Sequence, residues 1–144
     1  MPKILIGIDT GVHTGFAVAF DHGEGGVLQK VESLSITRAM QSVLEYEDEH
    51  DLKDIMLYIE DARKRTWFTG GREKAQGVGS VKRDAQIWED WCTEQGLNFK
   101  MIHPAANATK KKVEDFKRMT GWTGRTNEHA RDAAMLVFKR YWKA

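Results

Sequence analysis

A nearly unbroken apolar run close to the start of the chain, Lys3–Asp9 (KILIGID), most constrains what this sequence can fold into. A strand of consecutive apolar residues needs cover on both faces, so it belongs in the middle of a sheet between two layers. The run ends in Asp9, and a carboxylate at the end of a buried strand is costly unless something pairs with it. The sequence therefore predicts a central strand with a charged residue at its carboxyl end.

The elements after this strand follow a recognisable order. Glycine-rich turns lead to two further strands, which together with the first would form an antiparallel meander. Alternating helices and strands then follow. The predicted strands are Lys3–Asp9, Phe16–Phe20, Val27–Leu34, Asp54–Glu60 and Asn98–Ile102. The predicted helices run from about Met40 to Glu49, from Ser80 (as N-cap) to Gln95, from about Asn107 to Met119, and from Thr126 or Asn127 to about Trp142, with an exposed loop over residues 61–79.

The order βββ-α-β-α-β-α-α predicts a single α/β domain over residues 1–144. Three antiparallel strands followed by parallel ones imply a mixed five-stranded sheet with helices on both faces. That is the ribonuclease H-like order. Cys92 is the one cysteine and lies in a helical pattern, so we expect a small buried or interface hydrophobe. The sequence has no membrane-span or signal-peptide pattern, and together these features predict a cytoplasmic protein.

The net charge of +1 conceals a strong segregation of charge along the chain. Residues 21–60 hold three basic and ten acidic side chains, whereas residues 61–83 and 100–125 each hold seven basic and two acidic ones. Two basic blocks in an otherwise acidic chain indicate a localised phosphate-binding surface. The alternative is a pair of solvated lysine-rich loops.

Four residues form a candidate metal site. Glu60 ends its strand as Asp9 does, and in a sheet with these strands parallel and adjacent the two carboxylates would lie side by side. Close carboxylates repel each other and stay ionised together only around a cation. His129 and Asp132, three positions apart, share one helical face. Oxygen donors with one imidazole suit Mg²⁺ or Mn²⁺.

Each of these residues also has a plainer interpretation. Asp9 is suited to capping the turn that follows it, Glu60 to ending a strand in solvent, Asp132 to facing water, and His129 to packing or capping. Their joint placement favours a metal site. Two ions held there suit phosphodiester hydrolysis, with Asp9 between them and Glu60 and Asp132 holding one each. For His129 two roles remain open, metal ligand or acceptor of the water's proton.

Motifs along almost the whole chain resemble, in the same order, those of RuvC-type Holliday junction resolvases. The matching residues are Gly7-Ile8-Asp9-Thr10-Gly11 with Thr14-Gly15, then Ile59-Glu60, then His103-Pro104 followed by Lys110, and finally His129-x-x-Asp132-Ala133-Ala134. The resemblance implies a homodimer that binds four-way DNA junctions and nicks two strands symmetrically, with Asp9, Glu60, His129 and Asp132 as catalytic metal ligands. Thr10 stands where proline is common, the following turn is one residue shorter, and the chain is short, which favours a phage-type member.

Two basic segments are candidates for DNA contacts. The loop after Glu60 mixes cations with two adjacent aromatics, and we expect an aromatic wedge at the junction centre flanked by phosphate contacts. A loop that packs its aromatics on its own domain is the alternative. A lysine run opening the third helix is expected to grip phosphates near the scissile bond. The predicted DNA-binding residues are Arg63, Lys64, Arg65, Trp67, Phe68, Lys110, Lys111 and Lys112.

The helix predicted from Ser80 carries two apolar stripes. Val81, Ala85, Trp88 and Cys92 form one, and Ile87 with Trp91 forms the other. One stripe can cover the sheet and leave the other for a partner subunit, which predicts a two-fold dimer; one wide core-facing stripe is the alternative.

Three other functions compete with junction resolution. A ribonuclease H-like nuclease acting on flaps, other branched DNA or RNA–DNA hybrids would use the same residues. A non-catalytic junction-binding module would not need the acidic set. A sugar-kinase or actin-like ATPase shares the Asp9-Thr10-Gly11 pattern but needs two such domains.

Overall fold

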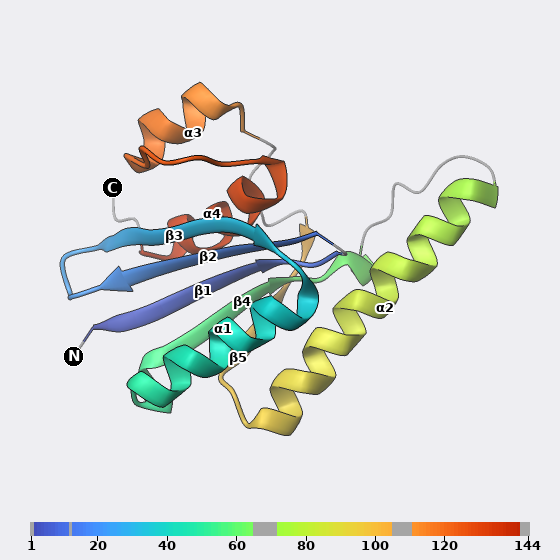
Figure 1. Cartoon of the computed structure of the whole chain (residues 1–144), viewed down its shortest axis with the longest axis horizontal. Coiled ribbons are helices and arrows are strands. Elements are labelled where there is room, and N and C mark those ends of the chain that lie inside the picture. The colour runs from blue at the N-terminus through green and yellow to red at the C-terminus, as the bar shows by residue number, and fades with distance from the viewer. Residues whose placement is uncertain (1, 12, 65–71, 105–110, 142–144) are drawn as a thin grey trace.

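The computed structural model describes residues 2–11, 13–64, 72–104 and 111–141 and shows a mixed five-stranded sheet (Figure 1). The strand order is β3-β2-β1-β4-β5, so the most apolar strand is central, as the sequence predicts. β1 pairs antiparallel with β2 and parallel with β4, while β2–β3 is antiparallel and β4–β5 parallel. The strands are β1 (Lys3–Asp9), β2 (Thr14–Asp21), β3 (Gly26–Leu34), β4 (Ile55–Glu60) and β5 (Phe99–Ile102).

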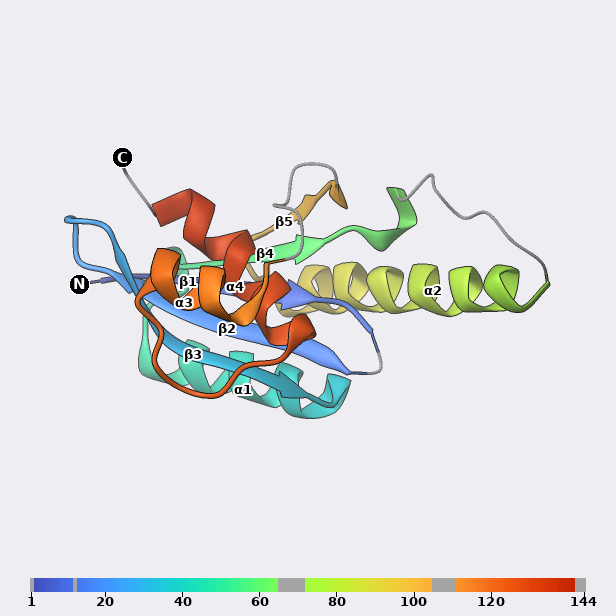
Figure 2. The same ribbon diagram turned by 90° about the horizontal axis from the view of Figure 1, so that it is seen from above.

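Helices cover both faces of this sheet. The helices are α1 (Ile36–Glu49), α2 (Arg72–Gln95), α3 (Val113–Thr120) and α4 (Glu128–Tyr141), with short 3-10 turns η1 (Leu52–Asp54) and η2 (Ala62–Lys64). One buried cluster joins the sheet to α1 and α2, and the other joins it to α3 and α4. Figures 1 and 2 show this arrangement, with α2 extending past the end of the sheet toward which β1 and β4 run. The predicted fold class and element order are confirmed.

Side chains of β1 and β4 alternate between the two cores. Ile4, Ile6 and Ile8 lie in the cluster under α1 and α2, while Leu5 lies in the cluster under α4. This alternation is the two-residue period of a strand. Both faces are covered, which explains why β1 reads as a continuous apolar run rather than an alternating one.

Two predicted helix starts are wrong. α2 begins at Arg72 rather than Ser80, so part of the predicted 61–79 loop is helical. α3 begins at Val113, and Lys112 is its N-cap in extended conformation, so Lys111 and Lys112 precede this helix instead of opening it. Lysines in a first turn would oppose the helix dipole, whereas Glu114 and Asp115 in the observed first turn favour it.

Smaller features of the prediction can also be compared with the structure. α1 starts one turn earlier than expected, because the Ser35 hydroxyl accepts a hydrogen bond from the Arg38 amide at 3.3 Å and caps the helix. Cys92 is fully buried in the core, and burial raises the pKa of its thiol to about 12. Within the described ranges, no helix combines the length and apolar character needed to cross a membrane.

Candidate active site

Two buried carboxylates lie at neighbouring strand ends. Asp9 and Glu60 are each only 5% exposed, and they follow directly on the paired residues Ile8 and Ile59 of the parallel β1–β4 pair. Because Ile8 and Ile59 face the α1–α2 core, strand alternation places the next residues on the α4 side. The predicted side-by-side placement at one end of the sheet is therefore observed.

Helix α4 lies unusually close to the sheet at this end. A Cβ added to Gly15 would overlap the His129 carbonyl oxygen, and one added to Gly7 would overlap that of Ala133. The helix presents Ala130, Ala133 and Ala134 to the core, all fully buried. Small residues on both sides allow the helix backbone to rest almost directly on β1 and β2.

This close approach brings His129 to Asp9. The His129 Nδ1 atom lies 3.3 Å from Asp9 Oδ2, and the His129 side chain is half exposed while that of Asp9 is buried. The exposed ring of His13, in the β1–β2 turn, lies 6.2 Å from the His129 ring between centroids. The β1 strand end and the start of α4 thus meet in a carboxylate–imidazole contact across 120 residues of sequence.

The four predicted metal ligands are only partly assembled. Asp9 contacts His129 and neighbours Glu60 through the strand register, and Asp132 follows His129 by three residues on α4, where it is half buried. Across the residues that the structure describes, no three His, Cys, Asp or Glu side chains form a group that would hold a metal ion. The chemistry of the donors nevertheless fits Mg²⁺ or Mn²⁺, since three are carboxylates and two of these are buried.

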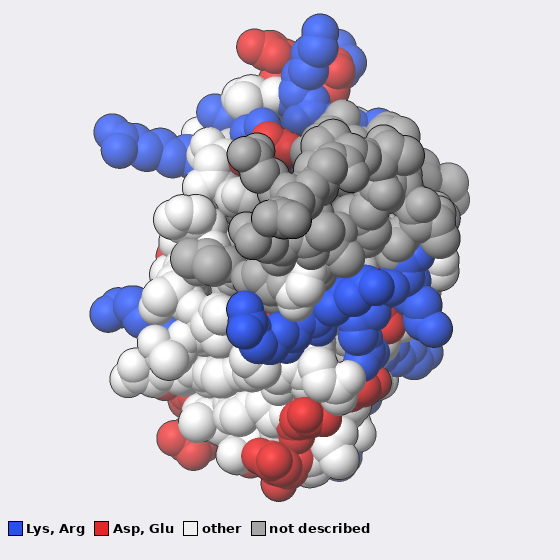
Figure 3. All heavy atoms as spheres, turned by 90° about the vertical axis from the view of Figure 1, so that its right-hand side faces the viewer, with Lys and Arg blue, Asp and Glu red and all other residues white. Residues whose placement is uncertain are grey.

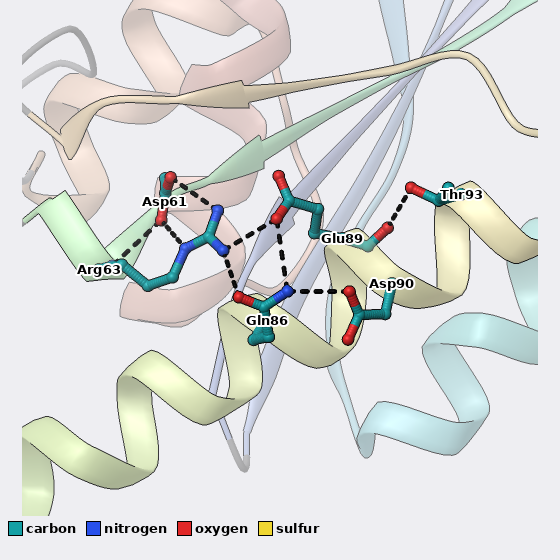
Figure 4. Close-up of polar contacts among 6 residues, drawn as sticks. All are labelled: Asp61, Arg63, Gln86, Glu89, Asp90 and Thr93. Carbon is teal, nitrogen blue, oxygen red and sulfur yellow. Dashed lines mark hydrogen bonds and ion pairs between the residues drawn. The ribbon is translucent and has the colours of Figure 1, made fainter.

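Another buried acid, Asp61, follows Glu60 and belongs to a polar network that sequence reasoning missed (Figure 4). Arg63 donates from Nε to Asp61 Oδ1 at 2.7 Å and from Nη1 to Gln86 Oε1 at 2.7 Å and Glu89 Oε1 at 2.9 Å. Burial tends to raise the pKa of Asp61, but hydrogen bonds from Arg63 and its charge more than offset this and lower it. The same partners raise the pKa of Arg63, so its guanidinium is firmly charged.

The predicted DNA-binding residues divide into three groups. Lys64 and Lys112 are exposed and Lys111 is half buried. Arg63 is engaged by the network in Figure 4, so the structure gives it other partners. The remaining four lie outside the described residues: Arg65, Trp67, Phe68 and Lys110.

Positive charge gathers at the end of the molecule that carries Asp9 and Glu60. Figure 3 views this end and shows a band of Lys and Arg side chains on it. Exposed basic residues on the elements that reach this end include Lys64 in η2 and Lys82 and Arg83 in α2. Such a concentration of positive charge would attract a polyanion to this end of the molecule.

The lysine segment before α3 is tied to the helix that carries His129. Arg131 Nε donates to the Lys111 carbonyl oxygen at 3.0 Å, and Arg131 Nη1 donates to Thr126 Oγ1 at 3.0 Å. The Asn127 side chain caps α4 by accepting from the Ala130 amide at 2.9 Å. These bonds fix Lys111 and Lys112 relative to the start of α4.

Comparison with known proteins supports the fold but does not identify the activity. No protein-family model matches the chain, and no curated protein sequence matches it. Among solved structures, the RuvC structure of Thermus thermophilus is similar, with a TM-score of 0.54 over 96% of this chain and 94% of that chain at 17% sequence identity. At that identity the likeness shows a shared ribonuclease H-like fold.

Proposed function

We propose that this chain is a metal-dependent endonuclease that resolves four-way DNA junctions by symmetric cleavage. The observation that carries the proposal is the contact of His129 of α4 with the buried Asp9, beside the end of the neighbouring strand that carries the buried Glu60, in a ribonuclease H-like sheet. Buried carboxylates at adjacent strand ends are costly in isolation, and functional sites are where proteins accept such a cost. The likeness to a RuvC structure supports the fold on which this proposal rests, and the motifs that resemble RuvC-type resolvases suggest the substrate.

In this proposal Asp9, Glu60, Asp132 and His129 would hold two Mg²⁺ or Mn²⁺ ions. Such ions, when bound, stabilise the negative charge that develops on a phosphodiester during hydrolysis. Asp9 is the central ligand, because it adjoins Glu60 through the sheet and His129 through space. The close seating of α4 on Gly7 and Gly15 holds the start of the helix against the sheet, where His129 contacts Asp9.

His129 has a second candidate role besides metal binding. Its side chain is half exposed and its Nδ1 atom contacts Asp9, an arrangement in which a carboxylate orients an imidazole. An imidazole so oriented accepts the proton of an attacking water when it is not a ligand. Substitution of His129 separates the two roles, as developed in the Discussion.

The positively charged end of the molecule is the proposed DNA surface. Lys64, Lys111 and Lys112 are proposed to bind phosphates, with Arg65 and Lys110 extending the surface. Trp67 or Phe68 is proposed to stack on bases at the junction centre. The tie from Arg131 to the Lys111 carbonyl supports a fixed spacing between the lysine segment and the cleavage site.

A two-fold dimer is proposed through α2. Ala85, Trp88 and Cys92 of this helix are fully buried in the core, while Ile87 is 40% exposed and Trp91 packs edge-on against Trp88. Two sites related by a two-fold axis would meet two opposite strands of a junction. We further propose a phage-type enzyme that acts in the cytoplasm of a bacterial or phage-infected cell.

The decisive experiment is cleavage of synthetic DNA with Mg²⁺ or Mn²⁺ by the wild-type chain and by Asp9→Asn. The variant should lose cutting of a four-way junction while binding it with similar affinity. Asp21→Asn is the matched control: it makes the same charge change at the other end of the sheet, and an asparagine oxygen can still accept the hydrogen bond from Gly23 N. It should cut like the wild type.

Parallel substrates separate the competing functions. Cutting of flaps or RNA–DNA hybrids in preference to junctions would replace resolution by another nuclease activity on this fold. Junction binding by the wild type without cutting of any substrate would identify a binding module. If the wild type neither bound nor cut any of these substrates, the proposal would be refuted.

A further inference from the structure

The guanidinium of Arg63 is surrounded by acceptors from two different elements (Figure 4). Nε and Nη2 donate as a fork to the two oxygens of the Asp61 carboxylate at 2.7 and 3.0 Å. Nη1 donates to α2, to Gln86 Oε1 at 2.7 Å and to Glu89 Oε1 at 2.9 Å. A fork on a carboxylate is the strongest geometry that arginine offers. Its neighbour Lys64 is exposed.

Asp61 is held by its backbone as well as by its side chain. Its amide donates to the Ile102 carbonyl at 2.7 Å, which continues the pairing of β4 with β5 past Glu60. Its carbonyl accepts from Lys64 N at 3.0 Å, and its Oδ1 accepts from Arg63 N at 3.1 Å. The exit of β4 is therefore closed into a tight turn directly after Glu60.

The α2 side of the network is braced in turn. Gln86, which accepts from Arg63, donates to Asp90 Oδ1 at 2.8 Å one turn further along the helix. Trp88 and Cys92 of the same helix are fully buried against the sheet. Arg63 thus connects the end of β4 to a helix whose other face is anchored in the core.

We infer that Arg63 is a positioning residue, which bridges Asp61 and Glu89 to hold the strand end of Glu60, and that it does not bind a DNA phosphate. This revises the expected role of Arg63 and rests on the proposed nuclease function. The bridge also holds η2 in place. It would therefore position both the catalytic carboxylate of Glu60 and Lys64, the first residue of the proposed DNA surface. The Arg63 side chain is 24% exposed, and each of its three nitrogens already donates to an acceptor.

The test separates positioning from DNA binding by single-turnover cleavage of a junction with excess enzyme. Arg63→Gln and Arg63→Lys should lower the maximal rate about 10- to 100-fold, because small misplacements of a catalytic group cost that much. The half-saturating concentration and the salt dependence of binding should stay as in the wild type. Lysine keeps the charge but not the fork, so it should not restore the rate.

A phosphate contact would give the opposite pattern. Loss of one contact lowers the slope of log affinity against log salt by about 1 and leaves the saturated rate intact. Lys64→Gln removes the adjacent proposed phosphate contact and should show this pattern. Lys53→Gln removes the same charge just before the start of β4, far from the proposed DNA surface, and should change neither rate nor salt slope. If Arg63→Gln behaves like Lys64→Gln while the wild type cuts, the inference is overturned.

Two further measurements test the bridge from its other end and without substrate. Glu89→Gln keeps an acceptor for Arg63 and should keep the rate within about threefold, whereas Glu89→Ala should lose it like Arg63→Gln. Amide exchange at Lys64 should become at least about tenfold faster in Arg63→Gln and stay unchanged in Lys53→Gln. Unchanged exchange in Arg63→Gln would overturn the bridge, whether or not the wild type cuts DNA. A wild type that cuts nothing would by itself refute only the proposed function.

Discussion

Replacing Gly15 by alanine tests the structural basis of the candidate site. The new Cβ would overlap the His129 carbonyl oxygen and would lie 3.0 Å from the Asp9 Cβ. The obstacle is helix backbone, which cannot rotate aside as a flexible side chain would. The start of α4 must therefore retreat by roughly 1.5 Å before an ordinary carbon–oxygen separation is restored.

The cost follows from what that retreat does to the core. A gap of 0.5–1 Å removes roughly a quarter to a half of the dispersion attraction across it, and Ala130, Ala133 and Ala134 all lie on the retreating face. Overpacking of a core costs about 1–3 kcal/mol, and the upper end is expected because backbone must move. At roughly 3 °C per kcal/mol for a domain of this size, the Tm of Gly15→Ala should fall by about 9 °C.

Thermal and urea unfolding measure the effect, and Gly79→Ala is the matched control. Gly79 lies within α2, and a Cβ there would meet nothing within 4 Å, so alanine should stabilise the helix by about 0.5–1 kcal/mol. Gly15→Ala should also cut junctions far more slowly in its folded state, since His129 moves away from Asp9. Equal stability of the two variants would refute the claim that α4 rests on the sheet backbone.

Four other results are expected. His129→Asp should retain most cleavage if the residue is a ligand, whereas a base role predicts at least about 100-fold loss and a changed pH–rate profile. Lys112→Gln should weaken junction binding and lower its salt slope by about 1, without changing the Tm. Burial raises the pKa of Asp84 above 3.8, so its charged form destabilises the fold; Asp84→Asn should gain about 1 kcal/mol at pH 7 by urea unfolding. That gain should fade as the pH falls through the raised pKa and be absent below 3.8, and a constant gain would exclude this cause. Ile87→Asp should sediment as the 16.4 kDa monomer while the wild type sediments at about twice that mass; a monomeric wild type would contradict the dimer.

The strands were predictable because their signal is local. Burial on both faces leaves a continuous apolar run, and the observed β1 bounds, Lys3–Asp9, are those predicted. The neighbouring placement of Asp9 and Glu60 followed from strand order alone. That reasoning needs only the direction of two strands, which the lengths of the connections largely determine.

The helix starts were harder to predict because competing local preferences nearly balance. Gly77 and Gly79 indicated a loop, yet α2 runs through both from Arg72. Each glycine costs a helix about 1 kcal/mol relative to alanine, whereas extension adds one hydrogen bond per residue through good helix formers such as Glu73 and Ala75. At α3 the acidic pair Glu114 and Asp115 was a usable start signal.

The polar network around Arg63 could not be predicted from the sequence, for a different reason. Residues 63 and 89 are brought together by packing of α2 on the end of β4, and no local pattern records that distance. A basic side chain in a basic segment is naturally taken for a phosphate contact. Which cation is already paired depends on tertiary contacts that the sequence alone does not display.

The seating of α4 on Gly7 and Gly15 has a consequence for redesign of the site. The separation between helix and sheet is set by main-chain atoms, which every amino acid shares, and not by the length of any side chain. Donor groups at positions 129 and 132 can therefore be exchanged, for instance to alter the choice of cation, while the support that carries them keeps its place.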